Sequence, residues 1–317
     1  MKRFIAYILT LAVLLSCQEK YAEPGTGIEE PVITTVKINI SAPEALSKAN
    51  LPLIPDVENL IHDVWVIQFS ERGVLYTGLD KFYRTSGEDG ARFLTLEAQV
   101  MSGKSTICIM ANLNKVNTPT KTFFDVKTLQ ASLPDNLPQF KNTLLDMGML
   151  LHHINTNTKP AALPMFGYWE GTIGSGSPEI GANNINVTLG RMVCRVNLTI
   201  ANKTASKIKW LKFTNASNKC YYFPQISSPA LSSSDSYCTN PDANTFELGV
   251  ESDHSATIYF YWGPNFCYGQ EQATKMTFTD ESGKTYTTYL TNSPLTDENI
   301  DYNLYYNCNY SVTATIQ

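Results

Sequence analysis

The chain has 317 residues, a formal net charge of −5 at pH 7 and a hydrophobic fraction of 43%. This is enough apolar material for a packed core, and the length favours two domains over one. The acidic balance argues against a nucleic-acid partner. Charged residues make up only 17%, while Tyr (17) and Phe (14) are abundant, which suits pleated, half-buried surfaces. Composition therefore indicates a globular, β-rich protein and excludes collagen-like and low-complexity classes.

The first residues have the pattern of an export signal. Met1-Lys2-Arg3 is cationic, residues 4–15 are apolar, and Ser16 leads directly to Cys17. The apolar run is shorter than the roughly 20 residues that span a bilayer. It therefore predicts a signal peptide over residues 1–16 rather than a transmembrane helix.

The string Leu-Leu-Ser-Cys at residues 14–17 resembles the lipobox of bacterial lipoproteins, in which the cysteine is acylated and becomes the mature N-terminus. Acyl chains contribute about 0.8 kcal/mol per buried methylene, so acylation of Cys17 is expected to hold the protein on outer-membrane lipid. The alternative is an ordinary signal peptide with an incidental cysteine. Residues 17–31 carry Gly, Pro and acids without an apolar period and are expected to form a tether.

Cysteine usage fits an exported protein. Cys17 is one of seven cysteines, so an even number remains, which permits disulfides outside the cytoplasm. Cys220 and Cys238 flank a Ser-rich stretch and are the best local pair, while Cys108 and Cys194 lie in apolar runs that favour small buried side chains. Because no CxxC pair or zinc-type spacing occurs, we expect no metal site and no cofactor.

Apolar residues alternate with polar ones along much of the chain, which predicts strands with one buried face. The first predicted strand is Ile33 to Ser41, with Val36, Ile38 and Ile40 facing the core. The later alternating segments are residues 65–69, 107–111, 258–262, 286–290 and 310–316. Residues 141–157 alone have apolar side chains at helical spacing and predict a short helix.

The alternation changes phase in one segment. Val187 and Leu189 lie on one phase, whereas the apolar residues after Gly190 lie on the other. A glycine at such a point is typical of a bulge or kink where a strand leaves one sheet and enters another. We therefore predict an all-β protein with an N-terminal domain over residues 32–186 and a C-terminal domain over residues 187–317.

The usual catalytic motifs do not occur. The sequence contains no G-x-S-x-G, P-loop, G-x-G-x-x-G or H-E-x-x-H, and its four histidines are scattered. An enzyme is therefore not expected. The aromatic-rich C-terminal half leaves open a surface glycan-binding lipoprotein of a nutrient-uptake system, because exposed rings stack on sugars.

A set of short segments, taken in order, carries a family resemblance. They are residues 57–61, 64–69, 72–75, Gly103 with 107–112, 163–167, 187–196 and 302–316. In this order and spacing they resemble the fimbrillins, the lipoprotein pilins of type V fimbriae. The last segment departs from the family, because Tyr306-Asn307 stands where an arginine-asparagine pair is common.

The resemblance implies two transthyretin-like, Ig-like β-sandwiches in tandem, a place on the outer membrane or cell surface, and assembly with other pilin subunits by donor-strand exchange. In such pilins a trypsin-like protease cuts after a basic residue behind the first strand. Loss of that strand opens a groove, which another subunit's strand fills by β-augmentation. Here the replaceable strand corresponds to Val36, Ile38 and Ile40.

The processing loop departs from an arginine-specific site. The first basic residue after the strand is Lys48, followed by Ala49, and the first arginine there is Arg72. Either Lys48 is cut, or the strand and the lipid are kept, as in an anchor subunit. Because the chain stops at Gln317, just past the last strand, we expect an accepting tip or accessory pilin that binds a host or bacterial surface ligand and does not polymerise alone.

Overall fold

The computed structural model describes residues 30–43, 46–47, 56–84, 90–113, 126–146, 163–176, 183–217, 219–227, 247–291 and 300–317. The chain divides into two units, Met1–Val32 and Ile33–Gln317. Of the first unit only residues 30–32 are described, so the elements below belong to the second.

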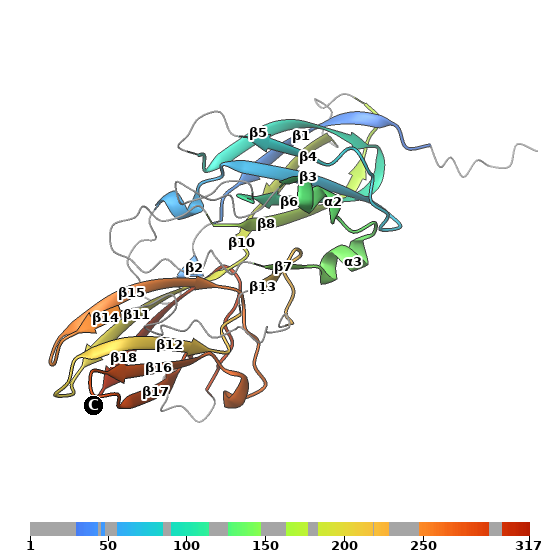
Figure 1. Cartoon of the computed structure of the whole chain (residues 1–317). Coiled ribbons are helices and arrows are strands. Elements are labelled where there is room, and N and C mark those ends of the chain that lie inside the picture. Colours follow the sequence, from blue (N-terminus) through green and yellow to red (C-terminus); the bar gives the residue numbers. More distant parts are fainter. Residues whose placement is uncertain are drawn as a thin grey trace, which may run out of the picture. The chain divides into compact units, whose positions relative to one another are not determined.

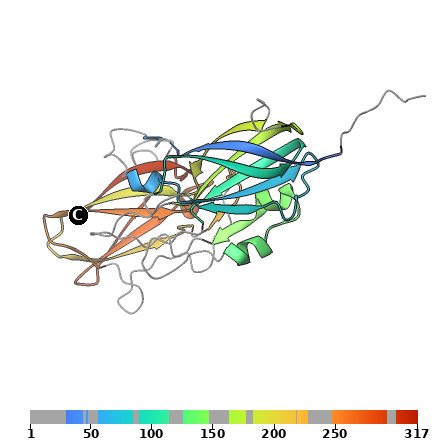
Figure 2. The ribbon, with the colours of Figure 1, turned by 90° about the horizontal axis from the view of Figure 1, so that it is seen from above.

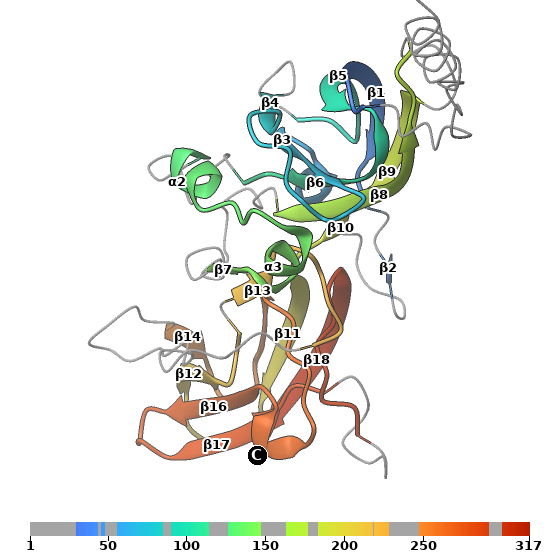
Figure 3. The same ribbon diagram turned by 90° about the vertical axis from the view of Figure 1, so that its right-hand side faces the viewer.

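A three-stranded and a five-stranded sheet form the N-terminal sandwich (Figures 1 and 3). The first sheet has the order β5 (Phe93–Met101), β1 (Ile33–Ser41), β9 (Asn184–Thr188). The second has the order β10 (Gly190–Arg191), β8 (Met165–Ile173), β6 (Gly103–Ala111), β3 (Asp63–Ser70), β4 (Lys81–Arg84). Their facing apolar side chains form one buried cluster, because side chains alternate across each strand and only one face of the three-stranded sheet is apolar.

The five-stranded sheet is buried on its other face as well. Trp65, Ile67 and Phe69 of β3 point away from the first core and are fully buried. The segment that contains α2 (Val126–Ala131) and α3 (Leu137–Asn142) contributes to the cover, with the Phe140 ring 5.2 Å from that of Phe69. A central strand with both faces covered reads as a continuous apolar run, which explains the sequence VWVIQF in β3.

Two four-stranded sheets form the C-terminal sandwich. One has the order β15 (Ser255–Trp262), β11 (Cys194–Asn202), β18 (Cys308–Ile316), β2 (Leu46–Ser47). The other has the order β14 (Glu247–Val250), β12 (Ile208–Thr214), β16 (Lys275–Asp280), β17 (Thr285–Tyr289). The described residues also contain two short 3-10 turns, η1 (Asp56–Asn59) and η3 (Gln270–Gln272). The predicted all-β class is confirmed.

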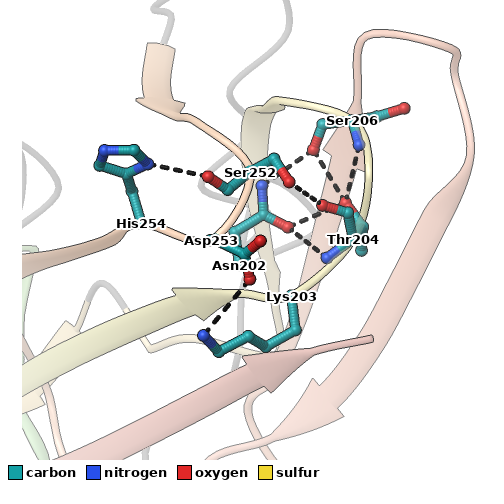
Figure 4. Close-up of polar contacts among 7 residues, drawn as sticks. All are labelled: Asn202, Lys203, Thr204, Ser206, Ser252, Asp253 and His254. Carbon is teal, nitrogen blue, oxygen red and sulfur yellow. Dashed lines mark hydrogen bonds and ion pairs between the residues drawn. The ribbon is translucent and has the colours of Figure 1, made fainter.

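A hydrogen-bonded clamp joins the two sheets of the C-terminal sandwich at one end (Figure 4). Asn202, the last residue of β11, is fully buried, and its Nδ2 donates to the carbonyls of Ser206 (2.8 Å) and Val250 (3.0 Å). Its Oδ1 accepts from the backbone N–H and the hydroxyl of Thr204. A buried amide needs such partners to offset its desolvation, so Asn202 ties the turn after β11 to the end of β14.

The helix predicted over residues 141–157 is wrong at residues 144–146, whereas residues 141–142 are the last two of helix α3. Residues 144–146 form strand β7, which pairs antiparallel with β13 (Lys219–Tyr221). A helix does form just before it, since Asn136 caps α3 by accepting from the Gln139 N–H at 2.9 Å and Pro138 lies in its first turn. Pairing with β13 overrides the helical spacing there, and residues 147–157 lie outside the described ranges.

Residues 184–202 form three consecutive strands that belong to three different sheets. β9 pairs with β1, β10 pairs with β8, and β11 pairs with β15 and β18. A single residue, Leu189, separates β9 from β10, and Met192-Val193 separates β10 from β11; all three side chains are buried. The phase change noted near Gly190 therefore falls where the chain passes between sheets.

Replacing Gly167 of β8 with alanine is expected to lower the free energy of unfolding by about 1–3 kcal/mol, because overpacking moves the backbone. A Cβ there would lie 2.7 Å from the Thr188 carbonyl oxygen and 2.7 Å from Val187 Cγ1, both in β9. Urea denaturation of Gly167→Ala measures the loss. Gly269→Ala is the control, since a Cβ at Gly269 has nothing within 4 Å, and an equal effect of the two changes would contradict the prediction.

Candidate functional site

The candidate site is the position that β1 occupies in its sheet (blue in Figure 2). β1 pairs antiparallel with β5 along its whole length, from Ile33 opposite Met101 to Ser41 opposite Phe93. On its other edge it pairs parallel with β9, from Lys37 beside Asn184 to Ser41 beside Thr188. The first described strand of the chain is therefore the central strand of three.

The three predicted inward side chains of β1 are buried. Val36 and Ile38 are 0% exposed and Ile40 is 2% exposed. They belong to the N-terminal core cluster, whose other members on the flanking and facing strands include Leu96, Ala98, Val100, Ile185, Val187, Val64, Val66, Ile107 and Ile109. These neighbours form alternate apolar pockets, which are the features that specify side chains when a strand is added to a sheet.

Because β1 lies between β5 and β9, its loss would leave a groove with the shape of a single strand. Neighbouring strands lie about 4.8 Å apart, so the axes of β5 and β9 are about 10 Å apart, and the loss of β1 would leave room for one strand between them. Both exposed edges would carry unpaired backbone groups. Because β1 is bonded on both edges, replacing it requires breaking and remaking hydrogen bonds on both sides, and only another extended chain can do this.

The segment after β1 crosses to the C-terminal sandwich. The Ala42 N–H donates to the Arg92 carbonyl at 2.8 Å, and Leu46-Ser47 then pairs in parallel with Cys308-Asn309 at the start of β18. The proposed cleavage residues Lys48 and Ala49 follow directly and lie outside the described residues.

Two other predicted sites also lie wholly or partly outside the described ranges. Cys17 is one of them. Cys220 is described and fully buried in β13, where burial raises the pKa of its thiol. Cys238 is not among the described residues, so the Cys220–Cys238 disulfide and the acylation of Cys17 stay predictions.

A buried charge cluster begins at Glu58, and sequence reasoning missed it. Glu58 of η1 is 0% exposed, and its Oε2 accepts from Arg195 Nη1 at 3.4 Å while its Oε1 accepts from the Tyr261 hydroxyl. Arg191 is 1% exposed and donates through Nε to Asn59 Oδ1 (3.1 Å) and through Nη1 to Asn309 Oδ1 (3.1 Å). The cluster thus links η1 to β10, β11, β15 and β18.

Burial dominates the electrostatics of this cluster. It raises the pKa of Glu58, against the lowering effects of the Arg195 charge and the Tyr261 hydrogen bond. It lowers the pKa of Arg191, and the neighbouring Glu58 charge acts in the opposite direction. Removing one partner of such a buried pair is costly because the other charge stays desolvated. One sequence signal could have found it: Arg191 and Arg195 are two arginines that bracket an apolar run.

Metal ligation and membrane-spanning helices can be assessed for the described residues. Among them, no three His, Cys, Asp or Glu side chains lie together as metal ligands. No helix in the described ranges is long and apolar enough to cross a membrane. The position of β1 between β5 and β9 is apolar on its core side. A strand is held there by backbone hydrogen bonds and side-chain packing.

Fimbrial and cell adhesion proteins are among the solved structures that are similar to this chain. The tip fimbrial protein Mfa3 from Porphyromonas gingivalis matches with a TM-score of 0.57 and 16% identity, over 90% of this chain and 96% of that one. A candidate cell adhesion protein from Parabacteroides distasonis matches with a TM-score of 0.58 and 15% identity, over 89% and 88%. The chain has a fimbrillin-like fold. The resemblance drawn from the sequence is thus confirmed for the fold.

A third solved structure shares the fimbrillin-like fold. It is a candidate cell adhesion protein from Bacteroides eggerthii, with a TM-score of 0.51 and 15% identity, over 89% of this chain and 86% of that one. No protein-family model matches the sequence, and no curated protein matches it. The likeness to fimbrial proteins therefore lies in three-dimensional structure.

Proposed function

We propose that the protein is a structural or adhesive subunit of a type V fimbria, a tip or accessory pilin that accepts a donor strand after losing its first strand. The observation that carries this proposal is the place of β1: it is the first described strand, it fills apolar pockets with Val36, Ile38 and Ile40, and it lies between β5 and β9. The fimbrillin-like fold supports it, since Mfa3, which shares that fold, is a tip fimbrial protein.

The proposal includes a maturation path. The precursor is exported as a lipoprotein acylated at Cys17 and reaches the outer membrane, and cleavage after Lys48 then frees β1 together with β2. If Lys48 is not cut, the retained strand and lipid make the subunit an anchor instead. β18 is paired with β11 along residues 309–316, so the strand that fills the groove comes from another subunit.

The mature N-terminus tests this path. We expect mass spectrometry of the protein isolated from the cell surface to find Ala49 at the N-terminus, and a Lys48→Ala variant to keep an acylated Cys17. Lys37→Ala is the matched control, because it removes a basic residue inside β1 without touching the loop. A mature wild-type protein that keeps residues 17–48 in assembled fimbriae would contradict the accepting role.

A further inference from the structure

The solvent face of β1 carries a polar ladder that runs across all three strands. Asn39 Nδ2 donates to Asn184 Oδ1 at 2.7 Å and to Asn186 Oδ1 at 3.0 Å, both on β9. On the other side, the Thr95 hydroxyl of β5 donates to Asn39 Oδ1 at 3.0 Å. Asn39 therefore bridges both neighbours of the central strand through one carboxamide.

A second rung follows two residues later on the same face. The Ser41 hydroxyl donates to Thr188 Oγ1 at 3.2 Å. Between and beyond the rungs this face is open: Thr95, Asn184 and Asn186 are exposed, while Asn39 is half-buried between them. The groups that contact Asn39 would remain in place on β5 and β9 if β1 left the sheet.

The ladder supplies information that the apolar pockets lack. A slip of one residue turns every side chain to the other face, so the core excludes it. A slip of two residues keeps the apolar face of β1 towards the core, but it brings Thr34 to the position of Val36 or Ala42 to the position of Ile40. Packing therefore resists this slip mainly at the ends of the row. Such a slip moves Asn39 away from Thr95, Asn184 and Asn186 and brings Lys37 or Ser41 to them. Asn39 is thus the residue that distinguishes registers two apart.

A carboxamide satisfies all three contacts with one side chain, because its Nδ2 donates to Asn184 and Asn186 and its Oδ1 accepts from Thr95. An aspartate only accepts and a lysine only donates, so either one would need the side chains of Thr95, Asn184 and Asn186 to turn. An aliphatic residue would lose all three bonds. The side chain of serine or threonine is too short for its hydroxyl to reach both flanking strands at once.

We propose that Thr95, Asn184 and Asn186 recognise an incoming strand by a carboxamide at the position of Asn39 and so fix its register. The inference rests on the proposed function, because it concerns the strand that replaces β1. The partner is an extended segment that runs antiparallel to β5 and parallel to β9. It carries branched aliphatic residues at three alternate positions, with asparagine between the second and the third.

Strand exchange into the nicked full-length protein tests the proposal. A protease site inserted between residues 48 and 55 lets the chain be cut without removing any part. The cut protein is then challenged with labelled peptides of residues 33–41. The first peptide has the native sequence ITTVKINIS. The second carries Lys37→Asn and Asn39→Lys together, which keeps the composition and the apolar alternation. The third, a control on the same face, carries Thr35→Val.

We expect the native and Thr35→Val peptides to exchange equally well and the swapped peptide to bind about tenfold more weakly. Three partly exposed hydrogen bonds at the low end of their usual net contribution give this factor. In protein that carries Asn184→Ala and Asn186→Ala, both exposed positions, the preference for the native peptide should shrink towards equality, as coupled partners do in a double-mutant cycle.

The outcomes distinguish the recognition of the Asn39 position from the proposed function. Equal binding of the native and swapped peptides overturns the recognition by Asn39 and leaves the proposed function standing. A preference that persists unchanged in the Asn184→Ala, Asn186→Ala protein also overturns it. If even the native peptide fails to exchange while the cut protein stays folded by circular dichroism, the replaceable strand itself is wrong, and the inference falls with it.

Discussion

Replacing Glu58 with alanine is expected to lower the free energy of unfolding by about 3–5 kcal/mol. The carboxylate is fully buried and contacts Arg195 and the Tyr261 hydroxyl. Its removal leaves two buried guanidinium groups, on Arg191 and Arg195, without the negative charge that offsets their desolvation. Guanidinium or urea denaturation of the purified mature protein measures the loss.

An exposed ion pair provides the matched control. Glu71 lies 2.8 Å from Lys104 Nζ, with side chains 62% and 64% exposed. Such a pair contributes little because water screens it, so Glu71→Ala should leave the denaturation midpoint almost unchanged. If Glu58→Ala were as mild as Glu71→Ala, the buried cluster would not hold η1 in place.

Replacing Ile38 with alanine is the second large expected effect, a loss of about 2–5 kcal/mol. Ile38 is fully buried at the middle of β1, opposite Leu96 of β5 and beside Ile185 of β9. Truncation removes apolar contacts and leaves a cavity that the flanking strands cannot close. Thermal or chemical denaturation of the intact chain gives the value.

The neighbouring Lys37→Ala serves as the control, because Lys37 points to solvent from the same strand. Its effect on unfolding should be small, as for exposed positions away from special features. In the nicked protein, Ile38→Ala should in addition make β1 leave the groove more readily. If Ile38→Ala left the free energy of unfolding unchanged, β1 would not be held by its apolar contacts.

The sequence predicted well those elements in which one face alone is buried. The alternation in residues 33–41 predicts a strand with the bounds that β1 has, because Val36, Ile38 and Ile40 face the core and their neighbours face water. The prediction fails at residues 144–146, where pairing with β13 decides the structure and helical spacing does not. Pairing between segments about 75 residues apart leaves no local signature.

The charge cluster and the Asn39 ladder could not have been predicted from pattern alone. Glu58 and Tyr261 are separated by 203 positions, and Asn39 and Asn184 by 145. Each contact exists only because the sheets bring distant strands together. A buried glutamate within VENLI and an asparagine within KINIS look like ordinary solvent-facing residues in the sequence, since periodicity reports which face a residue takes and not which partner it meets.

The run of residues 184–202 has an evolutionary consequence. Its three strands enter three sheets with only Leu189 and Met192-Val193 between them, and these connecting side chains are themselves buried. Homologues can therefore vary the lengths of outlying hairpins, whereas a single inserted or deleted codon here would invert the facing of the side chains in the strand that follows it. Length should be invariant across this stretch even where identity has drifted beyond recognition.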